Sequence, residues 1–113
     1  MLSKGEKIFI ITRRLFEKDL RRHFIGEVED VSGAVLRAKG HAYVFDDGTN
    51  KFLLREEDRT RIFSMTDSGI LILVLPENIQ IEEIRYSIDA QNQRVISDGK
   101  AFRLNISEFG PHR

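Results

Sequence analysis

The chain has 113 residues with 18 basic and 18 acidic side chains, so its formal net charge is zero. It contains no cysteine, which excludes disulfides, thiolate catalysis and cysteine-ligated zinc or iron–sulfur clusters. The balanced charge argues against long-range attraction to nucleic acid or to an anionic membrane. The length suits one domain, and we expect residues 1–113 to form a single β-rich domain.

No apolar run is long enough for a signal peptide or a membrane span. Near the start, Ile8–Ile11 is a short apolar run that Arg13 and Arg14 follow almost at once. The longest run, Ile70–Leu75, is far below the ~20 residues that a membrane-spanning helix needs. Together with the absence of cysteine, these features predict an intracellular, cytoplasmic protein without membrane contact.

Residues 7–16 are predicted to form the first strand, because Ile8–Ile11 is an uninterrupted run of β-prone side chains. The following stretch has two interpretations. Phe16, Leu20 and Phe24 fall four residues apart, which is helix spacing, and charged residues fill the other positions. A short helix and a charged turn both fit, and the lack of a clear cap residue favours the turn.

The clearest strand signal covers residues 34–45, where two kinds of residue alternate. One parity is small or apolar. The other parity contains the polar and aromatic residues Arg37, Lys39, His41 and Tyr43. This period of two predicts a half-buried strand or hairpin. Gly40 interrupts the apolar parity, and we expect either a β-bulge or a close backbone approach there.

Turn residues separate the next predicted strands. Residues 46–50 form a predicted hairpin loop between two apolar runs. Residues 59–65 then alternate, with Arg61, Phe63 and Met65 on one side of a strand. The apolar run Ile70–Leu75 is expected at the centre of the core.

The last third of the chain carries one ambiguous segment and one clear hairpin. Residues 79–88 place isoleucines at helical spacing but consist of β-prone types, which favours a strand over a helix. Residues 94–106 contain alternating runs around Asp98-Gly99, a strong hairpin signal. The sequence therefore predicts a mostly-β fold, a single antiparallel barrel or sandwich of about eight short strands, with room for one short helix.

No catalytic, metal-binding or cofactor motif is found. The three histidines lack ligand spacing, and residues 46–50 suit a tight turn better than a calcium loop. No phosphate-binding glycine loop and no G-x-S-x-G sequence occurs. We therefore expect no cofactor, no metal and no catalytic residue, with an enzyme using dispersed acid–base residues as the least favoured class.

Two clusters of basic residues could bind an anion. The row Arg37, Lys39, His41 and Tyr43 would lie on one exposed strand face, the geometry that tracks a phosphodiester backbone and stacks a base. Arg21 and Arg22 would assist. A solvated strand face explains the same pattern, because charged residues also protect sheet edges from aggregation.

The arginines near residues 55–61 follow the acidic residues 56–58. We expect surface ion pairs there, with an anion-binding arginine cluster as an alternative. The leading functional hypothesis is a non-catalytic binding or assembly domain that forms a homo-oligomer. The rival hypothesis is a module that binds single-stranded nucleic acid or another anion through the basic–aromatic strand face.

Overall fold

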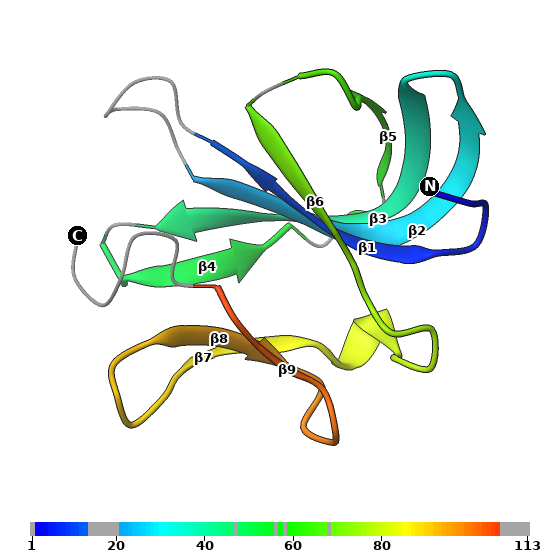
Figure 1. Cartoon of the computed structure of the whole chain (residues 1–113). Coiled ribbons are helices and arrows are strands. Elements are labelled where there is room, and N and C mark those ends of the chain that lie inside the picture. The colour runs from blue at the N-terminus through cyan, green and yellow to red at the C-terminus, as the bar shows by residue number, and fades with distance from the viewer. Residues whose placement is uncertain are drawn as a thin grey trace. The chain divides into compact units, whose positions relative to one another are not determined.

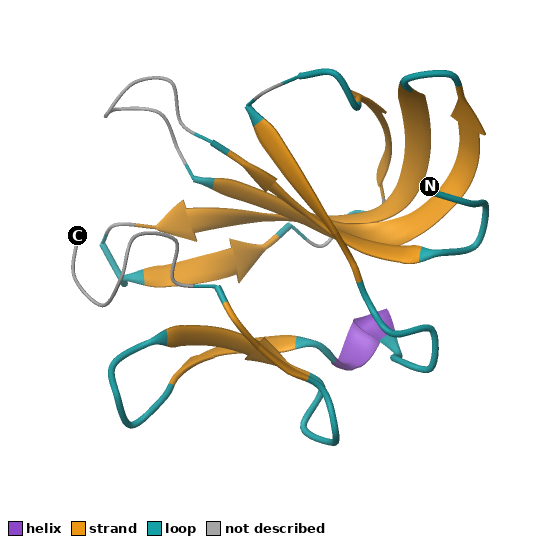
Figure 2. Ribbon diagram, in the orientation of Figure 1, coloured by secondary structure: helices purple, strands orange, loops and turns teal. Residues whose placement is uncertain are grey.

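The computed structural model describes residues 2–13, 21–46, 48–55, 57, 59–67 and 69–106. These residues form nine strands in two antiparallel sheets and one short 3-10 helix (Figure 2). The predicted mostly-β antiparallel fold is therefore confirmed. The chain divides into two compact units, Met1–Glu77 and Asn78–Arg113. The assignment of residues 1–113 to one domain stays a prediction.

The first unit is built on a six-stranded sheet. Its strands are β1 (Lys7–Thr12), β2 (Arg22–Ser32), β3 (Val35–Asp46), β4 (Lys51–Leu54), β5 (Arg59–Ser64) and β6 (Ile70–Val74). Their order is β4-β3-β2-β1-β6, and β5 pairs with another part of β3 (Figure 1). All of the pairings are antiparallel. The predicted strand at residues 7–16 is confirmed over β1, and the segment 14–20 lies outside the described residues.

The long hairpin of β2 and β3 forms the middle of this sheet. Ser32 pairs with Val35, so only two residues connect the strands, and Gly33 supplies the positive φ of 60° that the turn needs. The register shifts between Val28 and Asp30, which places a bulge in β2. Both strands are long and visibly curved (Figure 1).

Gly40 confirms the close-approach alternative rather than the bulge. It pairs with Gly26, and a Cβ added at Gly40 would lie 2.1 Å from the Ile25 carbonyl oxygen. A Cβ at Gly26 would lie 2.4 Å from the Lys39 carbonyl oxygen. The two backbones therefore meet at a distance that excludes any side chain larger than hydrogen.

One face of this sheet, which we call the inner face, holds a cluster of buried apolar side chains. The alternation in β3 directs Leu36, Ala38 and Ala42 into the cluster. β1 and β2 contribute through the same period of two, and partly buried residues from β5 and β6 pack against them. The cluster consists of Ile8, Ile10, Phe24, Val28, Leu36, Ala38 and Ala42. The half-buried strand predicted at residues 34–45 is thus confirmed.

The expectation that Ile70–Leu75 lies at the centre of the core is wrong. β6 occupies the end of the strand order and pairs with β1 alone in the described sheet. Leu71 is 54% exposed and Val74 is 56% exposed. Hydrophobicity along a strand reports the tendency to be buried, but it does not report the order of strands in a sheet.

The second unit is a three-stranded sheet preceded by a 3-10 turn. Its elements are η1 (Ile81–Glu83), β7 (Arg85–Ile88), β8 (Arg94–Ser97) and β9 (Arg103–Asn105). Asp98 closes the predicted hairpin, since its Oδ1 accepts hydrogen bonds from the Lys100 and Phe102 backbone N–H groups. Residues 79–88 combine both earlier alternatives, because the isoleucines begin a helical turn and Arg85 then starts a strand.

Candidate functional site

The four predicted binding residues of β3 lie on the face opposite the inner face. Arg37 and Lys39 are exposed, His41 is half-buried and Tyr43 is only 9% exposed. The neighbouring strand β2 places two acidic residues and one isoleucine beside the first three residues of this row. The alternation therefore brings these side chains onto one face, as expected, but it leaves the aromatic ring little exposed for stacking on a base.

Acidic side chains of β2 neutralise the charged end of this row. Arg37 Nε lies 3.4 Å from Glu29 Oε1, and an Arg37 terminal nitrogen lies 3.8 Å from Asp30 Oδ2. Lys39 pairs in register with Glu27. Carboxylates at this density repel a phosphodiester backbone, so the row has a weaker attraction for nucleic acid than its cations alone would have.

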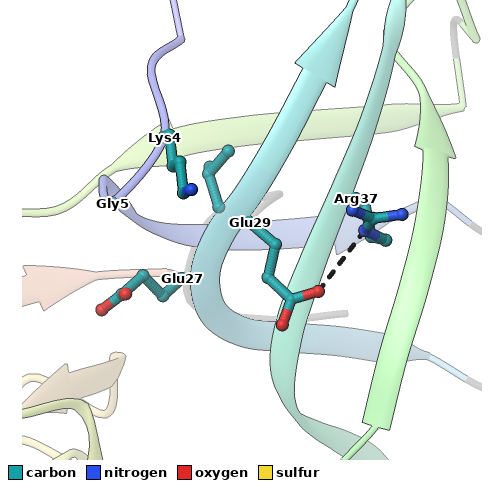
Figure 3. Close-up of a pocket in the computed structure, with 6 residues that line it drawn as sticks. Lys4, Gly5, Glu27, Glu29 and Arg37 are labelled. Atoms are coloured by element: carbon teal, nitrogen blue, oxygen red, sulfur yellow. Dashed lines mark ion pairs between the residues drawn. The ribbon is translucent and has the colours of Figure 1, made fainter.

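A surface hollow of about 400 Å³ lies at the same end of the sheet. Its lining includes Lys4, Glu27, Glu29 and Arg37, and Figure 3 shows the ion pair between Arg37 and Glu29. The hollow therefore combines two cationic and two anionic side chains. This balance favours solvent and zwitterionic groups over a strongly anionic ligand.

The two assisting arginines lie on different faces: Arg21 contacts Phe45, which continues the row, and Arg22 does not join it. The Arg21 guanidinium carbon lies 4.8 Å from the centroid of the Phe45 ring, a cation–π contact at the start of β2. Arg22 pairs in register with Val44, whose parity is opposite to that of Tyr43. Paired residues project to the same side of a sheet, so Arg22 belongs to the inner face. The six predicted binding residues are thus divided between two faces.

The free side of β6 is the feature that sequence reasoning missed. Leu75 N–H donates to Lys7 carbonyl oxygen, and Arg13 N–H donates to Gly69 carbonyl oxygen. Both of these hydrogen bonds involve odd-numbered residues of the β6 segment. In the antiparallel register, the odd-numbered residues of β6 therefore exchange hydrogen bonds with β1. The N–H and C=O groups of Ile72 and Val74 therefore point away from β1, toward the side on which β6 has no partner strand among the described residues.

The side chains of β6 add an apolar surface to these backbone groups. The strand has the sequence ILILV, with no charged residue. Leu71 and Val74 are both more than half exposed. An apolar edge without lysine, proline or a bulge is open to pairing with another strand. The sequence signal was the apolar run itself, but only the strand order shows that it forms an edge.

Within the residues that the structure describes, no group of three histidine or acidic side chains could hold a metal ion. His23 is buried, with its ring stacked on Phe52 at a centroid distance of 4.2 Å and edge-on to Phe9 at 5.0 Å. This histidine therefore acts as an aromatic packing residue.

Comparison with protein-family models, with curated proteins and with solved structures gives no match for this chain. None of the helices in the described ranges is long and apolar enough to cross a bilayer.

Proposed function

We propose that this chain is a non-catalytic assembly domain that pairs with a second copy of itself through the free edge of β6. The observation that carries the proposal is the combination of outward backbone groups and an uncharged strand at one edge of the sheet. Unpaired edge groups are a template for another strand, and isologous pairing about a twofold axis satisfies both copies at once.

The strand is compatible with its own antiparallel copy. With Ile72 at the twofold axis, Ile70 of one copy faces Val74 of the other. The outward groups are those of Ile72 and Val74 and the Ile70 C=O, since the Ile70 N–H donates to the Asp67 carbonyl oxygen. On the opposite face, Leu71 of one copy faces Leu73 of the other. The exposed Leu71 side chain thereby loses contact with water, which adds hydrophobic stabilisation to the new hydrogen bonds.

The mass of the protein as a function of concentration tests this proposal. Sedimentation equilibrium of the wild-type chain is expected to show a reversible monomer–dimer equilibrium. The double variant Leu71→Lys/Val74→Lys places two charges at the edge and is expected to remain monomeric. Ile62→Lys is the matched control, because Ile62 is 69% exposed on β5 and lies outside the proposed interface. This control should dimerise like the wild type.

Two results would overturn the assembly proposal. One is a wild-type chain that stays monomeric at every concentration up to the limit of solubility. The other is an Ile62→Lys variant that dissociates as readily as the double variant, which would move the interface away from β6. Circular dichroism of each variant confirms that the sheet is retained.

The rival function, binding of single-stranded nucleic acid by Arg37, Lys39, His41 and Tyr43, stays a prediction. The exposed positions of Arg37 and Lys39 support it, and the ion pairs of Arg37 oppose it. A fluorescence titration with a short mixed oligonucleotide at two salt concentrations tests it.

A cytoplasmic location belongs to the same proposal as the assembly function and rests on the cysteine-free composition.

A further inference from the structure

Three arginines of the first unit share the inner face of the sheet. Arg59 pairs with Gly40 and Arg61 pairs with Ala38, which places both on the side of the buried apolar cluster. Arg22 reaches the same side through its own pairing with β3. Arginines are rarely found on a core face unless they have a charged partner. Arg22 is exposed, whereas Arg59 and Arg61 are half-buried, so the position of these two requires an explanation.

A pair of aromatic rings shows that the arginines from the two strands come together. The Phe24 and Phe63 ring centroids are 5.4 Å apart, although the first lies on β2 and the second on β5. Both strands run antiparallel to β3, so they run in the same direction as one another. Arg22 and Arg61 each precede their phenylalanine by two residues. Both arginines therefore lie on the same side of the aromatic pair.

The floor beneath these side chains consists of the smallest residues in the sheet. β3 contributes Ala38, Gly40 and Ala42, and β2 contributes Gly26 in register with Gly40. Neither glycine carries a side chain, and the Phe24 ring lies close over Gly26. Arg59 and Arg61 pair with Gly40 and Ala38, so small residues of β3 lie beside both arginines.

The guanidinium groups are incompletely satisfied within the described part of the chain. The Nε atoms of Arg59 and Arg61 are buried there and have no hydrogen-bond partner. Arg59 reaches Glu57 with a terminal nitrogen at 3.4 Å, and Glu57 is largely exposed. A buried charged donor without an acceptor costs free energy, so an acceptor placed between these groups would stabilise the fold.

The three positive charges repel one another, and this repulsion affects the pKa of Arg61. The pKa of Arg61 is lowered, first by its burial and then by the positive charges of Arg59 and Arg22. An anion located among the three groups would remove both the repulsion and the lack of acceptors. Guanidinium groups form bidentate pairs with phosphate oxygens, and three of them match the several oxygens and double charge of a phosphoryl group.

We propose that Arg22, Arg59 and Arg61 form a binding site for the phosphoryl group of a small anionic ligand on the inner face of the sheet. The site is independent of the free edge of β6 and needs no second copy of the chain. Free phosphate and a phosphate monoester share the recognised chemistry. A carboxylate offers fewer oxygens and less charge, so it should bind more weakly.

Isothermal titration calorimetry at constant ionic strength tests the site, with inorganic phosphate and a nucleoside monophosphate as separate probes. At least one probe is expected to bind saturably. Arg61→Gln and Arg22→Gln should each weaken that binding by roughly tenfold or more, since each removes a charge-assisted contact. Tighter binding of the monophosphate would identify an ester as the ligand, and equal or tighter binding of inorganic phosphate would identify the free anion.

The control is Arg85→Gln, which removes the same charge from an exposed position in the second unit. It should bind each probe as the wild type does. The proposal is overturned if neither probe binds saturably, or if Arg85→Gln weakens binding as much as the variants of the cluster. Two cluster variants are used so that a failure of one to fold does not remove the test.

Discussion

Two edge strands of the first unit's sheet, β5 and β6, differ in the charge of their side chains. β6 carries no ionisable side chain, whereas β5 carries Arg59 and Arg61 within six residues. Both strands pair with a neighbour on one side, and both contribute partly buried residues to the core cluster. Charged side chains on an edge strand discourage pairing with a further strand. The same sheet is therefore protected from pairing with a further strand at β5 but not at β6.

This difference separates the two proposals in space. The uncharged strand offers backbone hydrogen bonds and apolar area, which suit another protein strand. The arginine-bearing strand offers fixed positive charge beside small residues, which suits a compact anion. Exposed apolar residues alone do not define the first surface, because Ile62 on β5 is more exposed than Leu71 or Val74 on β6.

The largest expected effect would break the comparison by separating β2 from β3, the strand with which β5 pairs. Gly40→Val puts a side chain into the close contact between β2 and β3, where even a Cβ would meet Ile25 carbonyl oxygen at 2.1 Å. We expect a loss of about 3 kcal/mol or more in the free energy of unfolding, or no folded state. Urea unfolding measures it. Gly48→Ala is the control, because its Cβ meets nothing closer than Asp46 at 3.5 Å.

A pair of proline variants sharpens the description of the β6 edge. Leu71 and Val74 are almost equally exposed, but the Leu71 N–H points toward β1 and the Val74 N–H points away. Leu71→Pro should therefore destabilise the monomer by about 3 kcal/mol, since it removes a hydrogen bond within the sheet. Val74→Pro should cost about 1 kcal/mol or less and should mainly weaken dimerisation. Equal destabilisation of the monomer by both variants would contradict the deduced orientation.

A smaller effect of opposite sign is expected at β5. Without phosphate, Arg61→Gln should raise the free energy of unfolding by about 0.5 kcal/mol, because it relieves repulsion among the three arginines. Thermal unfolding in a phosphate-free buffer measures this gain. The gain should shrink or reverse when phosphate is added, since only the wild type would bind the anion tightly. A loss of stability in both buffers would show that Arg61 is needed for packing alone.

The smallest effect concerns Asp89 in the second unit, which is not part of the six-stranded sheet. Hydrogen bonds from the Gln93 and Gln91 backbone, together with the Arg103 guanidinium at 2.7 Å, hold the pKa of Asp89 below its ordinary value of 3.8. The stabilisation is thus complete above that ordinary value and is lost as pH falls through the lower folded-state pKa. Asp89→Asn should lower the midpoint of thermal unfolding at pH 7 and flatten its acid dependence. Dimerisation and phosphate binding should stay unchanged.

The sequence predicted the strands well where one face of a strand is buried and the other is not. The alternation of residues 34–45 correctly separated Leu36 and Ala38 from Arg37 and Lys39, because the pleat directs successive side chains to opposite faces. The hairpin around Asp98-Gly99 was equally clear, since its turn residues have local conformational preferences.

The candidate sites were less predictable, because they depend on contacts between strands far apart in the chain. Arg61 shares its parity with Phe63, but only the packing of Phe63 on Phe24 shows that this parity faces the core. For β6, the position at the edge follows from its pairing with β1, a long-range contact that local patterns do not encode. The face on which Arg22 lies follows from its pairing with Val44, which local patterns do not encode either.

The pairing of β1 with β6 has a consequence for the synthesis of the chain. Ile8 pairs with Val74, so the second neighbour of β1 leaves the ribosome long after β1 itself. At ~5–20 residues per second, this interval is on the order of several seconds. During it, the apolar β1 has an edge without its native neighbour. A nascent chain in this state is a substrate for chaperones that bind extended apolar segments, until β6 completes the sheet.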